Sequence, residues 1–304
     1  MEFTGPLLFD PIYQTRVWGG DLLESELGRT LPAEIQRPVG ESWELVDRPE
    51  CSSVVANGPA RGKTLTELWA GYRVQVFGPN ALNCGRGRFP LLIKVLDCGD
   101  DLSIQVHPPE AQAEQLGGEP KSEMWYVLGA KPGARIIAGL KPNVTAEDFR
   151  SALSQGSVAA CIHEVHPRTG DCMMVPSGRL HALGAGLLVF EVQQNSDTTY
   201  RVYDWDRLGL DGKPRETHVE QSLTCIDFND VEPALNHAEV DQVVAECDFF
   251  RVTRSRTGHP RILMALETTQ WGGTSIDRGR VAIWPASLPP QQPQGEWLEI
   301  EVPW

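Results

Sequence analysis

The sequence lacks the features that define several classes of protein. Its 304 residues contain no run of about 18 apolar side chains, so we expect no transmembrane helix. Residues 1–6 show no basic region before an apolar stretch, so we expect no secretory signal and a cytoplasmic location. No repeat with a period of roughly 20 to 50 residues is visible, which argues against a solenoid.

Paired cysteines and surplus positive charge are also missing. The seven cysteines are scattered and form no Cys-x-x-Cys pair, which predicts reduced thiols rather than disulfides or a structural zinc knuckle. The chain has 27 Lys and Arg against 41 Asp and Glu, a formal net charge of -14. This charge disfavours nucleic acids and anionic membranes as partners. An anionic substrate would need a locally basic site, so lysines and arginines beside a candidate site become informative.

Short apolar and alternating segments predict strands along most of the chain. The segment 91–96 is nearly all apolar, as in a strand buried on both faces, although Lys94 interrupts it. Lys94 is either an edge residue whose amine reaches water or a functional residue. Segments 124–128 and 135–139 predict a hairpin around residues 131–133.

Two capping boxes predict short helices between the strands. Thr64 with Glu67 begins one, and Thr145 with Asp148 begins another that ends at Gly156. Many short strands separated by Gly and Pro predict a mainly β protein, a sandwich or a barrel. We expect a catalytic domain over residues 1–232 and a second, small β-domain over 233–304, which repeats the strand character.

One strand carries half of a candidate metal site. Segment 99–108 alternates apolar and polar residues, so Gln105 and His107 leave the same face of a strand. Two nitrogen or oxygen donors side by side on a rigid strand suit a divalent ion. A lone histidine is more often a hydrogen-bonded core residue, so the remaining ligands must come from elsewhere in the chain.

Two further patterns supply those ligands and follow the one in this strand. Gly99 opens G-x5-Q-x-H, Glu123 opens E-x5-G, and Gly170 opens G-x5-P-x-G-x2-H, which ends at His181. In this order they resemble the two motifs of the cupin superfamily, with Gln105 in place of the usual first histidine. The resemblance implies a jelly-roll-like cupin barrel in which Gln105, His107, Glu123 and His181 converge. Two imidazoles, a carboxylate and an amide oxygen suit zinc, and the absence of thiolates favours a catalytic site.

Longer segments resemble the type I mannose-6-phosphate isomerases in their short bacterial form. The resemblance covers roughly residues 7 to 225, through five separated stretches in the same order: 18–20, 40–44, 89–108, 121–126 and 194–205. It implies a zinc-dependent enzyme, with one ion per chain, that interconverts mannose 6-phosphate and fructose 6-phosphate. The ligands would be His107, Glu123 and His181, and Gln105 is the least secure.

The resemblance also implies roles for residues around the metal. Arg201 matches an active-site arginine that would stabilise an enediolate, and a salt bridge to Asp197, Asp204 or Asp206 is its structural alternative. Lys121 matches a lysine that would bind phosphate or move protons. Candidate substrate-binding residues are Lys94, Ser103, Glu41 and Trp18. Ser103 is equally well read as a strand hydroxyl, and Trp18 as core packing.

Two other functions remain open on the sequence. The same scaffold suits a cupin isomerase of another sugar or sugar phosphate, and a substrate panel would separate them. A non-catalytic sugar-binding cupin is the second, which the presence of every ligand and of Arg201 disfavours. An iron dioxygenase leaves the lysines unexplained. We expect a phosphorylated hexose as the small-molecule partner and a monomer or homodimer.

Overall fold

The computed structural model describes residues 1–304 as two compact units. Unit 1 comprises Met1–Tyr13, Ser42–Val95 and His237–Trp304, and unit 2 comprises Gln14–Glu41 and Leu96–Asn236. Strands β2 (Ile12–Gly20), β3 (Val39–Leu45) and β4 (Leu91–Cys98) run from one unit into the other. The predicted boundary near residue 232 stays a prediction. In the structure, the early segments Met1–Tyr13 and Ser42–Val95 belong to the same unit as the C-terminal segment.

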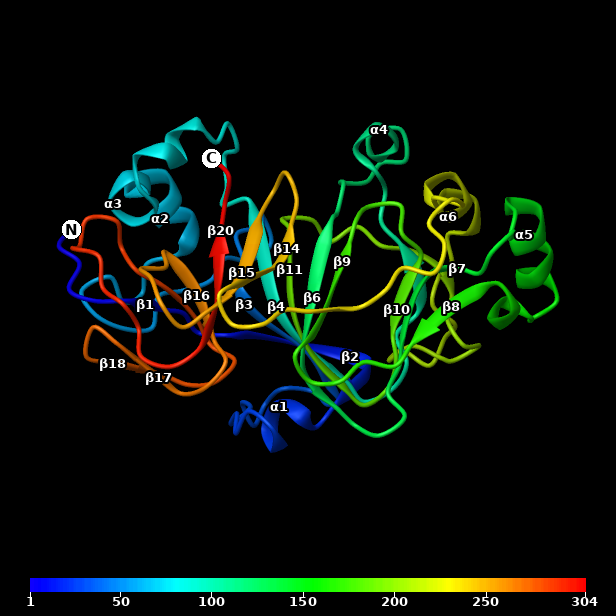
Figure 1. Ribbon diagram of the computed structural model, residues 1–304, viewed down its shortest axis with the longest axis horizontal. Coiled ribbons are helices and arrows are strands. Elements are labelled where there is room, and N and C mark those ends of the chain that lie inside the picture. Colours follow the sequence, from blue (N-terminus) through cyan, green and yellow to red (C-terminus); the bar gives the residue numbers. More distant parts are fainter. The chain divides into compact units, whose positions relative to one another are not determined.

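Two antiparallel sheets contain the strands of unit 2 (Figure 1). The first has the order β12 (Tyr200–Tyr203), β5 (Ile104–Val106), β10 (His181–Leu183), β7 (Ile136–Leu140) and β8 (Ile162–Val165). The second continues from β13 (Asn236–His237) through β9 (Asp171–Val175), β6 (Glu123–Ala130) and β11 (Leu187–Gln194) to β4, β2 and β3. The predicted mainly β fold is confirmed.

The alternation of side chains gives the first sheet of unit 2 two different faces. Ile104 and Val106 pack on the outer face in an apolar cluster with Phe149 of α5 (Ala146–Ser154) and Cys225 of α6 (Val219–Cys225). A second cluster fills the space between the sheets and takes residues from both, including Trp125 from β6 and Ala138 from β7. Gln105 therefore points from β5 toward the inter-sheet side, away from the helices.

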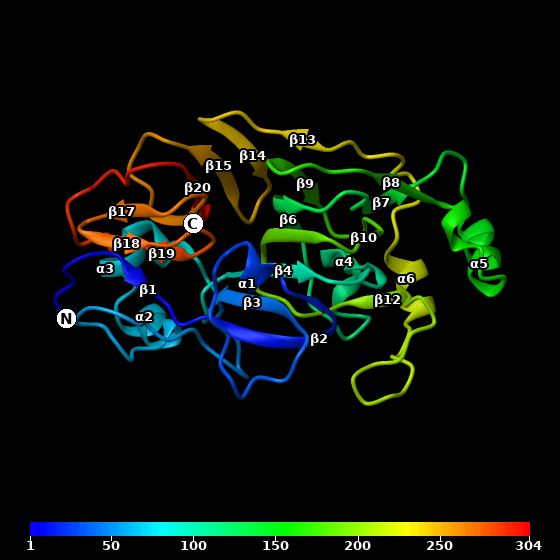
Figure 2. The ribbon, with the colours of Figure 1, turned by 90° about the horizontal axis from the view of Figure 1, so that it is seen from below.

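Unit 1 contains a six-stranded antiparallel sheet with a short accessory hairpin (Figure 2). Its order is β1 (Leu7–Leu8), β19 (Val281–Ile283), β16 (Ile262–Ala265), β20 (Trp297–Glu301), β15 (Arg251–Ser255) and β14 (Gln242–Glu246). The hairpin consists of β17 (Thr269–Trp271) and β18 (Thr274–Ile276). Tryptophans 271, 284 and 297 dominate the core beneath it.

Both predicted capping boxes are present. Thr64 and Glu67 cap α2 (Leu65–Gly71), and Thr145 and Asp148 cap α5, in each case with both reciprocal hydrogen bonds. The other helices are short: α1 (Leu22–Ser25), α3 (Arg73–Phe77), α4 (Glu110–Ala113), and the 3-10 turns Pro79–Asn83 and Val158–Ala160. None of the helices has the length and apolarity needed to span a bilayer.

The predicted hairpin over residues 124–139 is wrong. Strand β6 pairs with β9 and β11, whereas β7 pairs with β8 and β10 in the other sheet. The tight connection around Gly133, with φ +85°, is present, but it carries the chain across the sandwich instead of back along β6. Turn residues fix the local reversal, and the inter-sheet core selects the partner strand.

Strand β4 is buried at all eight positions, as the run of apolar residues predicts. Lys94 is included, so it is not an exposed edge residue. Its ammonium lies 5.4 Å from the ring centroid of Trp43, and both residues belong to unit 1. An amine at this depth needs charged or aromatic neighbours, and the indole supplies one of them.

Candidate metal centre

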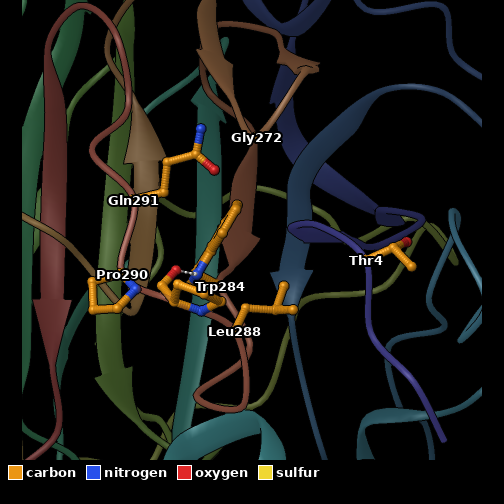
Figure 3. A pocket seen from close by; sticks show the side chains of 7 residues that line it. Thr4, Gly272, Trp284, Leu288, Pro290 and Gln291 are labelled. Carbon is orange, nitrogen blue, oxygen red and sulfur yellow. Dashed lines mark hydrogen bonds between the residues drawn. The ribbon is translucent and has the colours of Figure 1, made fainter.

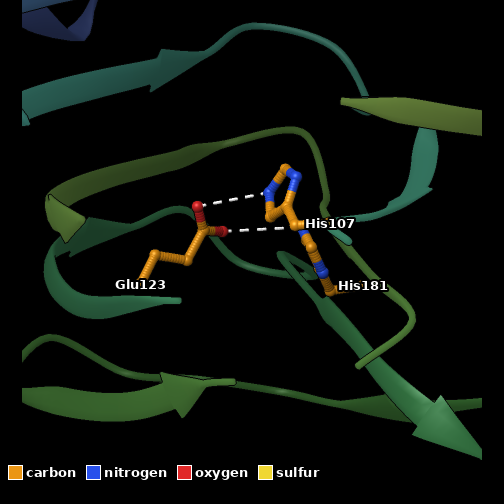
Figure 4. Close-up of side chains that lie close together, drawn as sticks. All are labelled: His107, Glu123 and His181. Carbon is orange, nitrogen blue, oxygen red and sulfur yellow. Dashed lines mark ion pairs between the residues drawn. The ribbon is translucent and has the colours of Figure 1, made fainter. Parts of the chain in front are cut away.

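Three side chains from separate segments of unit 2 meet at one point. His107 directly follows β5, Glu123 begins β6, and His181 begins β10. The Nε2 atoms of His107 and His181 lie 3.3 and 3.4 Å from the two Glu123 carboxylate oxygens. Figure 4 shows both rings turned toward that carboxylate. The potential ligand atoms all lie within 4.8 Å of one another, and all three residues are buried.

Hydrogen bonds to the backbone fix the two imidazoles for metal binding. His107 Nδ1 lies 2.9 Å from the Thr198 carbonyl, and His181 Nδ1 lies 2.8 Å from the Arg179 carbonyl. A carbonyl only accepts, so each Nδ1 carries the hydrogen and each Nε2 presents a lone pair. Metal-ligating histidines usually donate a hydrogen bond from their other ring nitrogen in this way.

The resulting cluster contains more acceptors than donors. His107 Nε2 and Glu123 Oε1 are buried and have no hydrogen-bond partner, whereas Glu123 Oε2 is paired with the Lys121 ammonium at 3.0 Å. Facing acceptors in a dry site repel one another and leave desolvation uncompensated. A divalent cation would satisfy all of them, so the residues present fit a metal ion. Two imidazoles with one carboxylate, and no thiolate, form a donor set typical of catalytic zinc.

The charge states agree with this role. Burial, followed by the nearby Lys121 charge, lowers the pKa of His107 to about 3, and burial also lowers the pKa of His181. Both rings are therefore neutral ligands near pH 7. Burial opposes the charge of Glu123, but Lys121, His107 and His181 together outweigh it and hold the pKa of this carboxyl well below its usual range. The carboxylate is ionised and ready to ligate.

Gln105 lies at the edge of this cluster. Gln105 on β5 pairs with His181 on β10, and the Gln105 amide nitrogen lies 3.3 Å from His181 Nε2. Its amide oxygen lies 3.3 Å from Ser103 Oγ. Rotating the amide by 180° would present the oxygen to a cation beside His181. Its assignment as a fourth ligand stays a prediction, as does the substrate contact of Ser103.

Lys121 and an unpredicted carboxylate, Glu191, extend the site. Lys121 Nζ lies 3.0 Å from Glu123 Oε2. Burial opposes the ammonium charge, yet Glu123 and Glu191 raise the pKa of Lys121. Glu191 on β11 is buried and accepts a 3.0 Å hydrogen bond from Trp125 Nε1. A single acidic residue within the apolar segment 187–192 is the signal that points to it in the sequence.

Arg201 on β12 pairs with Gln105 on β5, which places it next to the metal cluster in the sheet. Its Nη1 donates to the Glu216 carbonyl at 2.7 Å, and its Nε is buried without a partner. Of the three aspartates named as alternative partners, Asp204 is bound by Arg207 and Arg215 instead. Burial, and then Arg215, lowers the pKa of Arg201. A guanidinium without a carboxylate is available to an anionic ligand.

Three further predicted residues have contacts other than with the metal cluster. Trp18 packs in the inter-sheet core of unit 2. Glu41 forms an ion pair with Arg16, with contacts of 2.9 and 3.3 Å. Lys94 belongs to unit 1. Substrate contacts for Trp18, Glu41 and Lys94 stay predictions.

A separate cavity in unit 1 has a different character. Its volume is about 460 Å³, and Trp284, Leu288 and Pro290 form much of its wall (Figure 3). The Trp284 indole donates a 3.1 Å hydrogen bond to the Pro289 carbonyl. No His, Cys, Asp or Glu lines this cavity, so it offers no ligands of the kind found in unit 2.

The two antiparallel sheets and the buried His–Glu–His cluster define a β-sandwich protein with a candidate metal site. Residues 7–145 match the family model for the catalytic domain of type I phosphomannose isomerase. The chain is 37% identical over 257 residues to mannose-6-phosphate isomerase ManA of Bacillus subtilis, covering 82% of this chain and 78% of the relative. It is 34% identical to the probable mannose-6-phosphate isomerase GmuF of the same organism, covering 91% and 88%.

Solved structures agree with the sequence comparison. The crystal structure of a Bacillus subtilis mannose 6-phosphate isomerase superposes with a TM-score of 0.82 at 30% identity, over 98% of this chain and 100% of that one. The chain belongs to the type I phosphomannose isomerase family. The family resemblance inferred from the sequence is thereby confirmed.

Proposed function

We propose that this protein interconverts mannose 6-phosphate and fructose 6-phosphate with one zinc ion bound by His107, Glu123 and His181. The observation that carries the proposal is the buried convergence of ligand atoms from these three side chains, with His107 Nε2 and Glu123 Oε1 lacking a hydrogen-bond partner. Family membership supports the reaction, and the donor set supports zinc. Gln105 would complete the ligand set through its amide oxygen.

The reaction moves a proton between C1 and C2 and another between the two oxygens, through a cis-enediol. A bound zinc ion would supply Lewis acidity toward the oxygens at these carbons. Arg201, with a permanent charge and no carboxylate partner, would stabilise negative charge that develops on the enediolate oxygen. Lys121 would bind the phosphate or carry a proton beside the reacting carbons. The cytoplasmic location and the monomeric or dimeric state remain predictions of the sequence.

A coupled assay with mannose 6-phosphate tests the proposal. We expect turnover by the zinc-loaded protein, loss of turnover after chelation, and recovery when zinc returns. His107→Ala should fail to recover, because it removes a ligand. Full turnover by metal-free protein would contradict the zinc role. Faster turnover of another aldose phosphate in the same panel would contradict the substrate.

A further inference from the structure

Gln193 is a buried amide beside the metal cluster that no step of the reaction uses. It is completely buried on β11 and lies directly opposite Glu123 of β6 in the antiparallel ladder. Directly opposed residues of an antiparallel pair project from the same face of the sheet. The amide therefore shares the inter-sheet side with the Glu123 carboxylate.

Two hydrogen bonds fix the orientation of the Gln193 amide. Its nitrogen donates to the Gln194 carbonyl at 2.9 Å and to the Ser196 carbonyl at 2.5 Å. Reversing the amide would set its oxygen against two carbonyl oxygens, so this orientation is required. The amide oxygen is then buried without a donor. An apolar side chain of the same length would avoid that cost, so the benefit of the amide lies in its two donated bonds.

Those bonds hold a turn, residues 194–198, that contacts His107 and the residue before Glu123. On one side, the Thr198 carbonyl receives the hydrogen of His107 Nδ1 at 2.9 Å. On the other, the Gln194 side chain accepts from the Ser122 backbone at 2.8 Å, next to Glu123. The turn thus links the orientation of His107 to the start of the strand that carries Glu123.

Further hydrogen bonds tie the same turn to residue 119. Ser196 Oγ donates to the Glu119 carbonyl at 3.2 Å, and the Glu119 backbone N–H donates to Thr198 Oγ1 at 2.9 Å. Ser196 Oγ also accepts from the Thr198 backbone at 3.2 Å. The turn is therefore held by two sets of hydrogen bonds, one from Ser196 Oγ and one from the Gln193 amide. Substitutions can remove the two sets separately.

We propose that Gln193 is a positioning residue for the metal site: it holds turn 194–198 so that the Thr198 carbonyl keeps the His107 ring oriented toward the ion. This inference rests on the proposed function, because it assumes that His107 ligates a cation. Removing a direct outer contact of a ligating histidine changes metal affinity by about 10- to 100-fold, and Gln193 acts on that contact through Thr198, so we expect an effect at the lower end. Gln193 is not one of the proposed ligands, so its removal weakens binding without deleting a ligand.

The test measures metal binding in Gln193→Met, a substitution that keeps length and removes the amide. We expect zinc affinity, from competition with a chromogenic chelator, to fall about 10-fold, the lower end of the range for direct outer contacts. The visible absorption of the cobalt-substituted protein should change, because the ring angle at the metal changes. Gln155→Met, on the exposed end of α5, is the matched control and should bind like wild type. Ser196→Ala removes the hydrogen bond from the same turn to the Glu119 carbonyl and should also weaken zinc binding.

The outcomes separate this inference from the proposed function. Unchanged affinity and cobalt spectrum in Gln193→Met, even with a lower melting temperature, would overturn the positioning role. If Gln193→Met does not fold, Ser196→Ala decides, and unaltered affinity there would overturn it. If His107→Ala binds zinc as tightly as wild type, the proposed metal site itself is wrong. Tight binding by wild type, loss in His107→Ala and no change in Gln193→Met would leave the proposed function intact and refute this inference alone.

Discussion

Lys121 Nζ lies 3.0 Å from Glu123 Oε2, with both side chains almost completely buried. The lysine supplies the positive charge that the carboxylate needs when no cation is bound. It stands two residues before Glu123, which is the first residue of β6. A metal ion at the cluster would add a second positive charge beside the same carboxylate, so the metal-free protein depends most on the lysine.

Lys121→Met should therefore destabilise the metal-free protein far more than the zinc-bound protein. Removing one partner of a buried ion pair costs about 3–5 kcal/mol, because it leaves an uncompensated charge. Zinc would restore most of that loss. Denaturant unfolding with chelator and with zinc measures the difference. Lys63→Met, which breaks an exposed pair with Glu67, should leave stability nearly unchanged in both conditions. Equal destabilisation with and without zinc would contradict the argument.

Local sequence patterns predict the parts of the fold that depend on contacts between residues close together in the chain. The two capping boxes form because Thr64 and Thr145 satisfy helix N–H groups within their own first turn. Gln105 and His107 share a face because a strand alternates. The convergence of His107 with Glu123 and His181 required the motif resemblance, since no local rule brings together residues so far apart in the chain.

The wrong hairpin prediction and the two residues that the sequence did not indicate, Glu191 and Gln193, all involve contacts with other strands of the sandwich. The reversal after β6 looks like a hairpin turn, and only the inter-sheet core shows that β7 joins the other sheet. Glu191 lies in a strand that otherwise reads as core, and its role emerges from the Trp125 hydrogen bond and its charge near Lys121. Gln193 is similar, because nothing in its own segment indicates that it faces Glu123.

Arg201→Met should reduce kcat by about 100- to 1000-fold, the usual effect of removing one group that stabilises developing negative charge. Zinc content should not change, because the contacts of Arg201 are to the Glu216 carbonyl and do not include the metal cluster. Arg201→Lys should recover part of the rate. Arg150→Met, on the surface of α5, is the control and should be fully active. Loss of zinc together with activity would show a structural role.

Gly99→Ala should destabilise the protein strongly, whereas Gly129→Ala should not, although both glycines belong to the metal-site motifs. A Cβ at Gly99 would lie 2.3 Å from the Gly19 carbonyl oxygen and 2.8 Å from Gly20 Cα. Backbone atoms cannot move aside as side chains do, so we expect a loss of about 3 kcal/mol. At Gly129 the nearest atom is Leu188 Cβ at 3.6 Å, an ordinary contact. Similar unfolding free energies for the two variants would contradict this reading.

Glu299 gives unit 1 a pH-dependent stability that is independent of the metal. Burial on β20, followed by the charge of Glu301, raises the pKa of Glu299 from 4.5 to about 7. The folded state therefore holds a proton that the unfolded state releases, and the stability from Glu299 is lost as pH rises from about 4.5 through 7. Glu299→Gln keeps the neutral form at every pH. It should be more stable than wild type at pH 8 by on the order of 1 kcal/mol, a value reduced for partial exposure.

The advantage of Glu299→Gln should shrink to nothing as pH falls toward 4.5, because the wild-type carboxyl is then neutral as well. Urea unfolding of the metal-free protein at several pH values measures it, and Glu301→Gln is the neighbouring control. Glu301 is exposed and only a secondary cause of the shift, so its variant should gain less stability than Glu299→Gln. A gain in Glu299→Gln that stays constant from pH 5 to 8 would mean that packing, not the buried charge, is responsible.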